Sequence, residues 1–336
     1  MSSRRIPVAL TAGDPVGVGP EIAAGLLARA GDRGADIFLV GSAPHLLAAI
    51  GAAGAAPPPV LEAEAAVGGP MPARFPVIVD IPAPGPVAPG GPSAASGAVS
   101  GGAIETAARM ARGGRVEAIV TGPVSKEALH LAGYPWRGHT EMLADLFDAP
   151  DCQMMMVSGA MRIVILTRDI PLRDVPAAVT QARLAAGIRV TAGALRSLWG
   201  IERPSIAVAA LNPHAGDGGV TGMEEIDTIR PALEALRGEG IDARGPFPAD
   251  TLFMDSRRRT FDAIVALYHD QGMIPFKIGG FDEGVNMTIG LPVLRTSVCH
   301  GTAYDIAGTG TAESGSLRTA LDVAVECCRR SAGSTV

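Results

Sequence analysis

The chain of 336 residues has few aromatic side chains, few cysteines and no large excess of charge. Phe, Trp and Tyr make up only 4% of it, so its core must be packed mainly with aliphatic side chains. A net charge of −6 without basic runs argues against nucleic acid as a partner. The four cysteines lack the CxxC spacing of a zinc knuckle, which is typical of a protein from a reducing compartment.

Several sequence signatures are also missing. No apolar stretch is long and uncharged enough to span a membrane, and Ile6–Leu10 predicts a first β-strand rather than a signal peptide. We therefore expect a cytoplasmic protein without a membrane partner. No GxGxxG, GxxxxGK[ST] or GxSxG motif occurs, and the glycine-rich residues 13–19 do not fit the dinucleotide fingerprint.

The chain instead alternates short apolar runs with helical segments. This alternation predicts parallel sheets with helices on both faces, and so an α/β fold. Strands are expected at 6–10, 37–40, 76–81, 118–120, 154–157, 163–167, 205–211, 263–267 and within 287–294. Helices are expected at 20 to about 30, 102–112, 141–146, 182–198, 224–239 and 317–330. The Ala-, Gly- and Pro-rich residues 51–100 predict a surface connection around the strand at 76–81.

Polar side chains gather among glycines and short apolar runs in residues 268–310. They are His269, Asp270, Lys277, Asn286, Arg295, His300 and Asp305. Ligand sites in α/β proteins lie at such strand ends. Two cations suit an anionic substrate, and an imidazole beside a carboxylate suits metal or proton chemistry.

Two earlier loops offer weaker signals. Lys126 follows a Gly-Pro turn after a strand, where it would place an ammonium in a cleft or simply be a solvated lysine. Thr140 is expected to cap a helix that starts at Glu141, whose free N–H groups attract a phosphate or carboxylate. In the alternative interpretation, Thr140 only caps the helix and His139 only packs.

His214 and His269 each follow an apolar strand, and His214 lies in the glycine-rich sequence LNPHAGDGG. Two imidazoles from different strands are the usual start of a divalent metal site. Asp169, at the end of IVILTRD, is a candidate third ligand. The residues alone favour the other interpretation of Asp169, a loop carboxylate that pairs with Arg168 or Arg173.

Eight ordered segments resemble the 4-hydroxythreonine-4-phosphate dehydrogenase family. They are TAGDPVGVGPEI, TGPVSKEAL, GHTE, LNPHAGDGG, GPFPADTLF, YHDQGMIPFK, GVNMTIGLPVLRTS and HGTAYDIAG. The resemblance implies a two-domain α/β/α fold similar to isopropylmalate and isocitrate dehydrogenases, and a homodimer with its active site at the subunit interface. It places a first, cofactor-side domain at 1–128 plus 248–336. The second domain, at 129–247, would supply substrate, metal and dimer contacts.

The resemblance also implies roles for residues. Substrate contacts would be His139, Thr140, Lys277, Asn286 and Arg295. NAD, or alternatively NADP, would lie on His300, Gly301, Thr302, Ala303 and Asp305. A divalent zinc, magnesium or cobalt ion would be held by Asp169, His214 and His269, with Asp250, Asp270 and Lys126 in catalysis. The chain departs from the family at Asp169, where histidine is usual, and at Cys299, where aspartate is usual; Asp169 favours harder metals.

The implied reaction, a step of pyridoxine biosynthesis, is NAD-dependent oxidation of 4-phosphooxy-L-threonine to 2-amino-3-oxo-4-phosphooxybutanoate. Decarboxylation then gives 3-amino-2-oxopropyl phosphate. The alternative substrate is 4-phospho-D-threonate or D-erythronate. A carbocyclic cis-diol dicarboxylate is disfavoured because His139, Thr140, Lys277 and Arg295 suit a phosphate. An inactive metabolite-binding relative is favoured only by Asp169.

Overall fold

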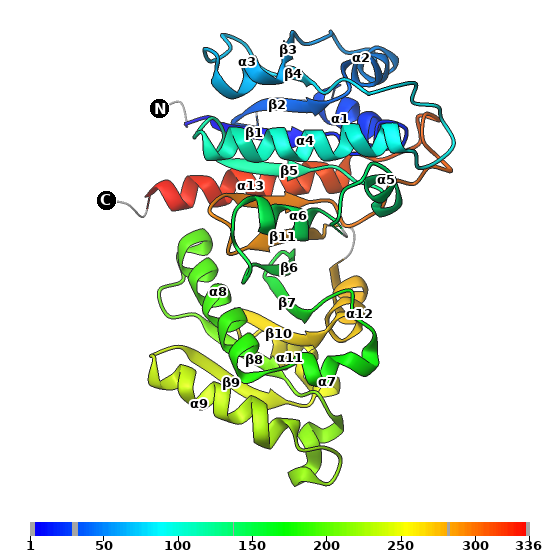
Figure 1. Cartoon of the computed structure of the whole chain (residues 1–336). Helices are drawn as coiled ribbons and strands as arrows, with labels where there is room; N and C mark the ends of the chain where they lie inside the picture. Colours follow the sequence, from blue (N-terminus) through cyan, green and yellow to red (C-terminus); the bar gives the residue numbers. More distant parts are fainter. Residues whose placement is uncertain (1–3, 29–32, 137, 281–282, 334–336) are drawn as a thin grey trace. The chain divides into compact units, whose positions relative to one another are not determined.

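The computed structural model describes residues 4–28, 33–136, 138–280 and 283–333. Its contacts divide the chain into two compact units, each of which contains six of the described strands. The first unit comprises Met1–Pro150 and Leu291–Arg329, and the second comprises Asp151–Gly290 and Arg330–Val336. Figure 1 shows strands and helices alternating along the chain, which confirms the predicted α/β class.

The sheet of the first unit is parallel throughout its described strands, in the order β3-β4-β2-β1-β5-β12. Their bounds are β1 (Ile6–Thr11), β2 (Ala35–Gly41), β3 (Val60–Glu62), β4 (Val77–Asp80), β5 (Ala118–Thr121) and β12 (Leu294–Ser297). The helices are α1 (Gly19–Ala28), α2 (Ala43–Ala52), α3 (Ala63–Gly68), α4 (Ala94–Arg112), α5 (Lys126–Leu131), α6 (His139–Leu146) and α13 (Gly315–Gly333).

Helix α4 covers one face of this sheet, where it packs on β1, β2 and β5 (Figure 1). Its small residues allow close packing, and the core between helix and sheet includes Phe38, Ile104 and Met110, all fully buried. A capping box between Ser93 and Ser96 fixes the start of the helix at Ala94. The predicted start at Gly102 was therefore too late, because Ala, Ser and Gly in the first turns carry no amphipathic signal.

The second unit has a mixed sheet in the order β11-β6-β7-β10-β8-β9, in which β6 is antiparallel to both its neighbours and the remaining pairs are parallel. The strands are β6 (Gln153–Ser158), β7 (Met161–Thr167), β8 (Ser205–Ala209), β9 (Asp242–Phe247), β10 (Ala263–Tyr268) and β11 (Val285–Ile289). The helices are α7 (Val175–Ala178), α8 (Gln181–Trp199), α9 (Arg230–Gly238), α10 (Ala249–Leu252), α11 (Asp255–Arg258) and α12 (His269–Gly280), with short turns η1 (Leu172–Asp174), η2 (Pro213–Gly219) and η3 (Glu225–Ile229).

Several boundaries differ from the sequence-based prediction. Residues 248–290 belong to the second unit because β10 pairs with β7 and β8, and residues 129–150 belong to the first because α6 packs on α4. Residues 51–100 contain β3 and α3 besides the expected strand. The predicted helix from 20 extends to Ala28 in the structure, and its expected residues 29 and 30 lie outside the described residues.

Candidate active site

Arg295 is the centre of a polar cluster in the first unit. It lies on β12, is only 2% exposed, and donates from Nε and Nη2 to Thr121 Oγ1 at 3.2 and 2.7 Å. Thr121 ends the neighbouring strand β5 and donates to Ser297 Oγ at 2.9 Å. A guanidinium that is almost fully buried and hydrogen-bonded to a neutral hydroxyl is well suited to an incoming anion.

His139 lies near this buried cation, at the first residue of α6. Burial, and secondarily the positive charge of Arg295, lower the pKa of His139 well below its ordinary value. Its Nε2 is buried and has no hydrogen-bond partner among the described residues. An orphaned imidazole nitrogen beside a buried guanidinium indicates that a ligand belongs here.

Lys126 reaches the same helix start. A Cβ placed on Gly138 would lie 3.8 Å from both Lys126 Cε and Glu141 Oε2. Helix α6 begins at His139 after Gly138, with no side-chain cap, so Thr140 is a buried residue of the first turn. The prediction that Thr140 caps the helix was therefore wrong, because the helix begins two residues earlier, at His139, and Gly138 takes the cap position.

The predicted cofactor residues form an irregular segment of the first unit, residues 299–312. The His300 ring contacts Gly301 O at 2.9 Å, and Asp305 is exposed. A Cβ at Gly301, Gly308 or Gly310 would meet nothing within 4 Å. This open backbone beside an exposed carboxylate fits a dinucleotide, since a carboxylate is the usual partner of ribose hydroxyls.

The three predicted metal ligands belong to the second unit and follow adjacent parallel strands. Asp169 follows β7, His269 follows β10 and His214 follows β8, and β10 lies between the other two. His269 Nδ1 contacts Asp270 Oδ1 at 2.7 Å, which leaves Nε2 for another partner. The topology thus places all three residues after the carboxyl ends of neighbouring parallel strands.

The side chains themselves are not assembled as a metal site. Among residues 4–28, 33–136, 138–280 and 283–333, no group of three or more His, Cys, Asp or Glu side chains is arranged to hold a metal ion. Asp169 is exposed and has a left-handed backbone, with φ of 42°. The predicted donor set therefore does not fit a metal ion as arranged here.

The turn that carries His214 has an unusual backbone. Five consecutive residues, His214–Gly218, have φ between 45° and 80°, three of them not glycine. Each such non-glycine residue costs about 1–2 kcal/mol, so the surrounding structure must hold the turn in place.

Two buried side chains hold the residues that lead into this turn, and neither was predicted. Glu225, fully buried, accepts from Leu211 N and Asn212 N at 2.8 and 2.7 Å, and from Asn212 Nδ2 at 2.9 Å. Gln271 accepts from Leu267 N and donates to Ala210 O, both at 2.7 Å. Gln271 thereby ties the end of β10 to the start of the His214 loop.

The remaining predicted residues are more dispersed in the second unit. Asp250 is exposed and accepts from Thr251 N at 2.9 Å. Lys277 is exposed on α12, about 12 Å along the helix axis from His269 at 1.5 Å per residue. Asn286 lies on β11, and its Oδ1 is buried without a hydrogen-bond partner in the described chain.

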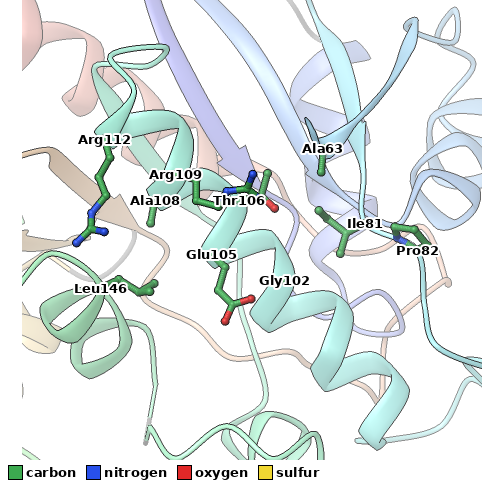
Figure 2. Close-up of a pocket in the computed structure, with 10 residues that line it drawn as sticks. All are labelled: Ala63, Ile81, Pro82, Gly102, Glu105, Thr106, Ala108, Arg109, Arg112 and Leu146. Carbon is green, nitrogen blue, oxygen red and sulfur yellow. The ribbon is translucent and has the colours of Figure 1, made fainter. Parts of the chain in front are cut away.

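A hollow of about 420 Å³ lies elsewhere in the first unit (Figure 2). Helix α4 lines it with Glu105, Arg109 and Arg112. Arg109 pairs with exposed Glu64 at 2.6 Å, and Glu105 accepts from Tyr134 at 3.4 Å. Since its lining residues include none of the predicted ones, the hollow is not the candidate site.

None of the described helices is long and apolar enough to cross a membrane.

Comparison with known proteins identifies the family. Residues 36–324 match the model of the pyridoxal phosphate biosynthetic protein PdxA. The 4-hydroxythreonine-4-phosphate dehydrogenase of Geobacter metallireducens is 43% identical, over 98% of this chain and 97% of that protein. A putative D-threonate 4-phosphate dehydrogenase of Bradyrhizobium diazoefficiens is 42% identical over 96% of each.

A solved structure agrees with these relatives. The crystal structure of 4-hydroxythreonine-4-phosphate dehydrogenase from Klebsiella pneumoniae matches with a TM-score of 0.84 and 39% identity, covering 96% of this chain and 99% of that one. The match extends over nearly the whole of both chains. This chain therefore belongs to the PdxA family of pyridoxal phosphate biosynthetic proteins.

Proposed function

We propose that this chain is an NAD-dependent dehydrogenase that oxidises 4-phosphooxy-L-threonine to 2-amino-3-oxo-4-phosphooxybutanoate, which then decarboxylates to 3-amino-2-oxopropyl phosphate. Family membership supports the reaction class. The observation that carries the phosphorylated substrate is the cluster of buried Arg295 and the orphaned Nε2 of His139. Both groups suit a phosphate, which a guanidinium can bind with paired hydrogen bonds.

In this proposal, the chain's residues bind and orient the substrate. Arg295 and His139 take the phosphate, and Lys126 adds positive charge at the start of α6. Thr140 is a further proposed substrate contact of the first unit, and Lys277 and Asn286 are proposed contacts of the second. NAD, when bound, supplies the acceptor for the hydride. Asp250 or Asp270 accepts the hydroxyl proton; Asp270 is the one already hydrogen-bonded to an imidazole, at 2.7 Å.

A divalent ion held by Asp169, His214 and His269 remains a proposal. Its support is the placement of the three residues after adjacent strands and the chemistry of two imidazoles with a carboxylate. Because these side chains form no three-residue group in the structure, the steps above do not depend on the ion. The carboxylate of Asp169 favours magnesium over zinc or cobalt relative to a third histidine.

The second candidate substrate is 4-phospho-D-threonate or D-erythronate. A relative 42% identical to this chain bears the name of a putative D-threonate 4-phosphate dehydrogenase, which favours keeping this candidate. Both substrate types carry a phosphate, so the same Arg295 and His139 cluster would serve either. Selectivity between the two substrates must therefore come from the groups that contact the end of the substrate opposite the phosphate.

A homodimer in the cytoplasm completes the proposal. Large apolar side chains are exposed after the three strands that lead to the predicted ligands: Leu172, Val220, Ile274 and Ile278, at 70, 83, 57 and 83% exposure. Such exposure suits burial against a second subunit. No disulfide is recorded among Cys152, Cys299, Cys327 and Cys328 in the described chain, which fits a reducing compartment.

The test is NADH formation with each phosphorylated hydroxy acid, with magnesium, zinc or cobalt supplied in turn. We expect turnover with 4-phosphooxy-L-threonine that an Arg295→Lys variant largely loses, since lysine cannot replace the fork of guanidinium donors. Faster turnover of 4-phospho-D-threonate would establish the second candidate. Binding of these phosphates without turnover of any of them would leave the inactive metabolite-binding relative.

A further inference from the structure

The glycine-rich turn between β1 and α1, residues 12–19, matches no dinucleotide fingerprint and contains none of the predicted site residues. Within it, Asp14 is a fully buried carboxylate. It accepts from Val16 N at 3.0 Å through Oδ1, and from Ser96 Oγ at 3.1 Å and Tyr304 OH at 2.9 Å through Oδ2. The last of these donors belongs to the segment 299–312.

The hydroxyl of Tyr304 remains a hydrogen-bond donor across the physiological pH range. Burial is the main cause that raises the pKa of Tyr304 to about 12, and the charge of Asp14 adds to it. The phenol therefore keeps its proton at any physiological pH and donates to the carboxylate throughout. A hydrogen bond to a charged, buried acceptor is stronger than one between neutral groups.

The backbone of the turn also contacts the segment. Val18 N donates to Thr302 O at 2.9 Å. A Cβ on Gly17 would lie only 2.8 Å from Thr302 O, so any residue other than glycine would push the two backbones apart.

Glu21, in the first turn of α1, holds the far end of the segment. Its Oε2 accepts from Gly308 N at 2.9 Å and its Oε1 from Ala312 N at 3.1 Å. One carboxylate thus bridges two backbone groups that are four residues apart. Together with Asp14 and Val18, it secures residues 302–312 at several points along their length.

We propose that residues 14–21 hold the segment 299–312 in the conformation that binds NAD, and that Glu21 and Tyr304 are positioning residues for the cofactor. The proposal rests on the proposed function, in which His300 to Asp305 contact NAD. Residues 299–312 contain no helix or strand of their own, so fixing their backbone for a ligand costs conformational entropy. Contacts that fix them beforehand raise the fraction of molecules ready to bind.

The experiment uses the full chain and two conservative variants with matched controls. Tyr304→Phe removes the hydroxyl that bonds to Asp14, and Glu21→Gln replaces one acceptor oxygen with an amide that repels an N–H group. Tyr134→Phe is the control for the first, because Tyr134 is also half-buried, donates to Glu105 at 3.4 Å and has a pKa raised to about 12. Glu64→Gln, which breaks only the exposed pair with Arg109, is the control for the second.

Two readouts are measured: the NADH dissociation constant by fluorescence titration, and amide hydrogen exchange at Gly308 and Ala312. We expect both test variants to bind NADH roughly tenfold more weakly, with faster exchange at these amides, and both controls to match the wild type. Faster exchange with unchanged NADH affinity would overturn the proposal, since the segment's conformation would then not matter to binding. A wild-type chain that binds no NADH would instead reject the proposed cofactor, and this proposal with it.

Discussion

His139, whose Nε2 is buried, is a single residue that makes the stability of the protein depend on pH. Its pKa in the folded protein is well below the ordinary value of 6.5, chiefly because burial disfavours the charged ring and secondly because Arg295 repels it. Above pH 6.5 the ring is neutral in both the folded and the unfolded chain, so it leaves stability unaffected. As the pH falls below 6.5, the unfolded chain binds a proton that the folded chain does not.

We therefore predict that the free energy of unfolding falls with decreasing pH from about 6.5 down to the folded pKa, by at most about 1.4 kcal/mol per pH unit for this one group. His139→Gln should remove this component in urea unfolding measured at a series of pH values. Exposed His130, changed to Gln, is the control. An unchanged pH dependence in the His139 variant would show that other groups are responsible.

Asp169 stands where the family resemblance implies a histidine, and its role in the proposed metal site can be tested directly. If it ligates the ion, Asp169→Ala should weaken metal binding by more than the roughly 10- to 100-fold cost of losing an outer-shell partner. Asp169→His should raise affinity for zinc and cobalt relative to magnesium, because imidazole is the softer donor. Isothermal titration with each ion measures both effects.

Asp174→Ala is the matched control, since Asp174 lies in the following turn and pairs with Arg173 at 3.7 Å. Full metal affinity in the Asp169→Ala variant would remove Asp169 from the ligand set. The two histidines would then need a different third partner.

At the scale of elements, the left-handed turn at His214–Gly218 depends on a buried carboxylate. Glu225→Ala would leave Leu211 N, Asn212 N and Asn212 Nδ2 without their acceptor, at about 1–3 kcal/mol for each buried donor. We predict a loss of several kcal/mol in the free energy of unfolding, together with faster amide exchange at residues 211 and 212.

A variant of the neighbouring Glu224 tests whether this effect comes only from the loss of a negative charge. It is more exposed, and it accepts from Asn212 Nδ2 at 2.7 Å and from the backbone of Glu224 and Met223, but not from Leu211 N or Asn212 N. Glu224→Gln should therefore change both readouts little. Equal effects of the Glu224 and Glu225 variants would mean that Glu225 is not what holds the turn.

The sequence predicted most strands, missed β3 and β9, and predicted some helices poorly, for physical reasons. Strands such as β1 and β5 are continuous aliphatic runs between turn residues, so their pattern is unambiguous. Helix α12 was not foreseen, because Gly272 and Pro275 both disfavour a helix. Packing overrides propensity there: a Cβ on Gly272 would lie 3.0 Å from Ala266 Cβ and from Ile163 Cγ2, so glycine lets the helix sit on the sheet.

The residues of the candidate site were also predicted only in part. Residues that would touch a ligand, such as His139 and Arg295, were recognisable because their motifs resemble a known family. The residues that hold the loops carrying other predicted site residues in place, Glu225, Gln271 and Tyr304, were not predicted. Their hydrogen bonds join segments that only the fold brings together, and Tyr304 and Asp14 are 290 residues apart in the chain. No local pattern predicts such contacts.

For the whole molecule, the proposed dimer can be tested on helix α12. Ile274 and Ile278 are four residues apart, so they lie on the same helical face, and they are 57% and 83% exposed. Burying an isoleucine fully contributes about 1.5–3 kcal/mol, whereas burying an unpaired aspartate is unfavourable.

Ile278→Asp should therefore weaken the dimer by roughly 100-fold or more, which corresponds to a loss of about 2.8 kcal/mol at 1.4 kcal/mol for each factor of ten. Sedimentation velocity over a range of protein concentrations measures this directly. Met71→Asp, which changes another exposed apolar side chain in the first unit, should leave the association unchanged. If Ile278→Asp sediments as the wild-type dimer does, α12 lies outside the interface, and the apolar surface of the second unit must be covered by something other than a second copy.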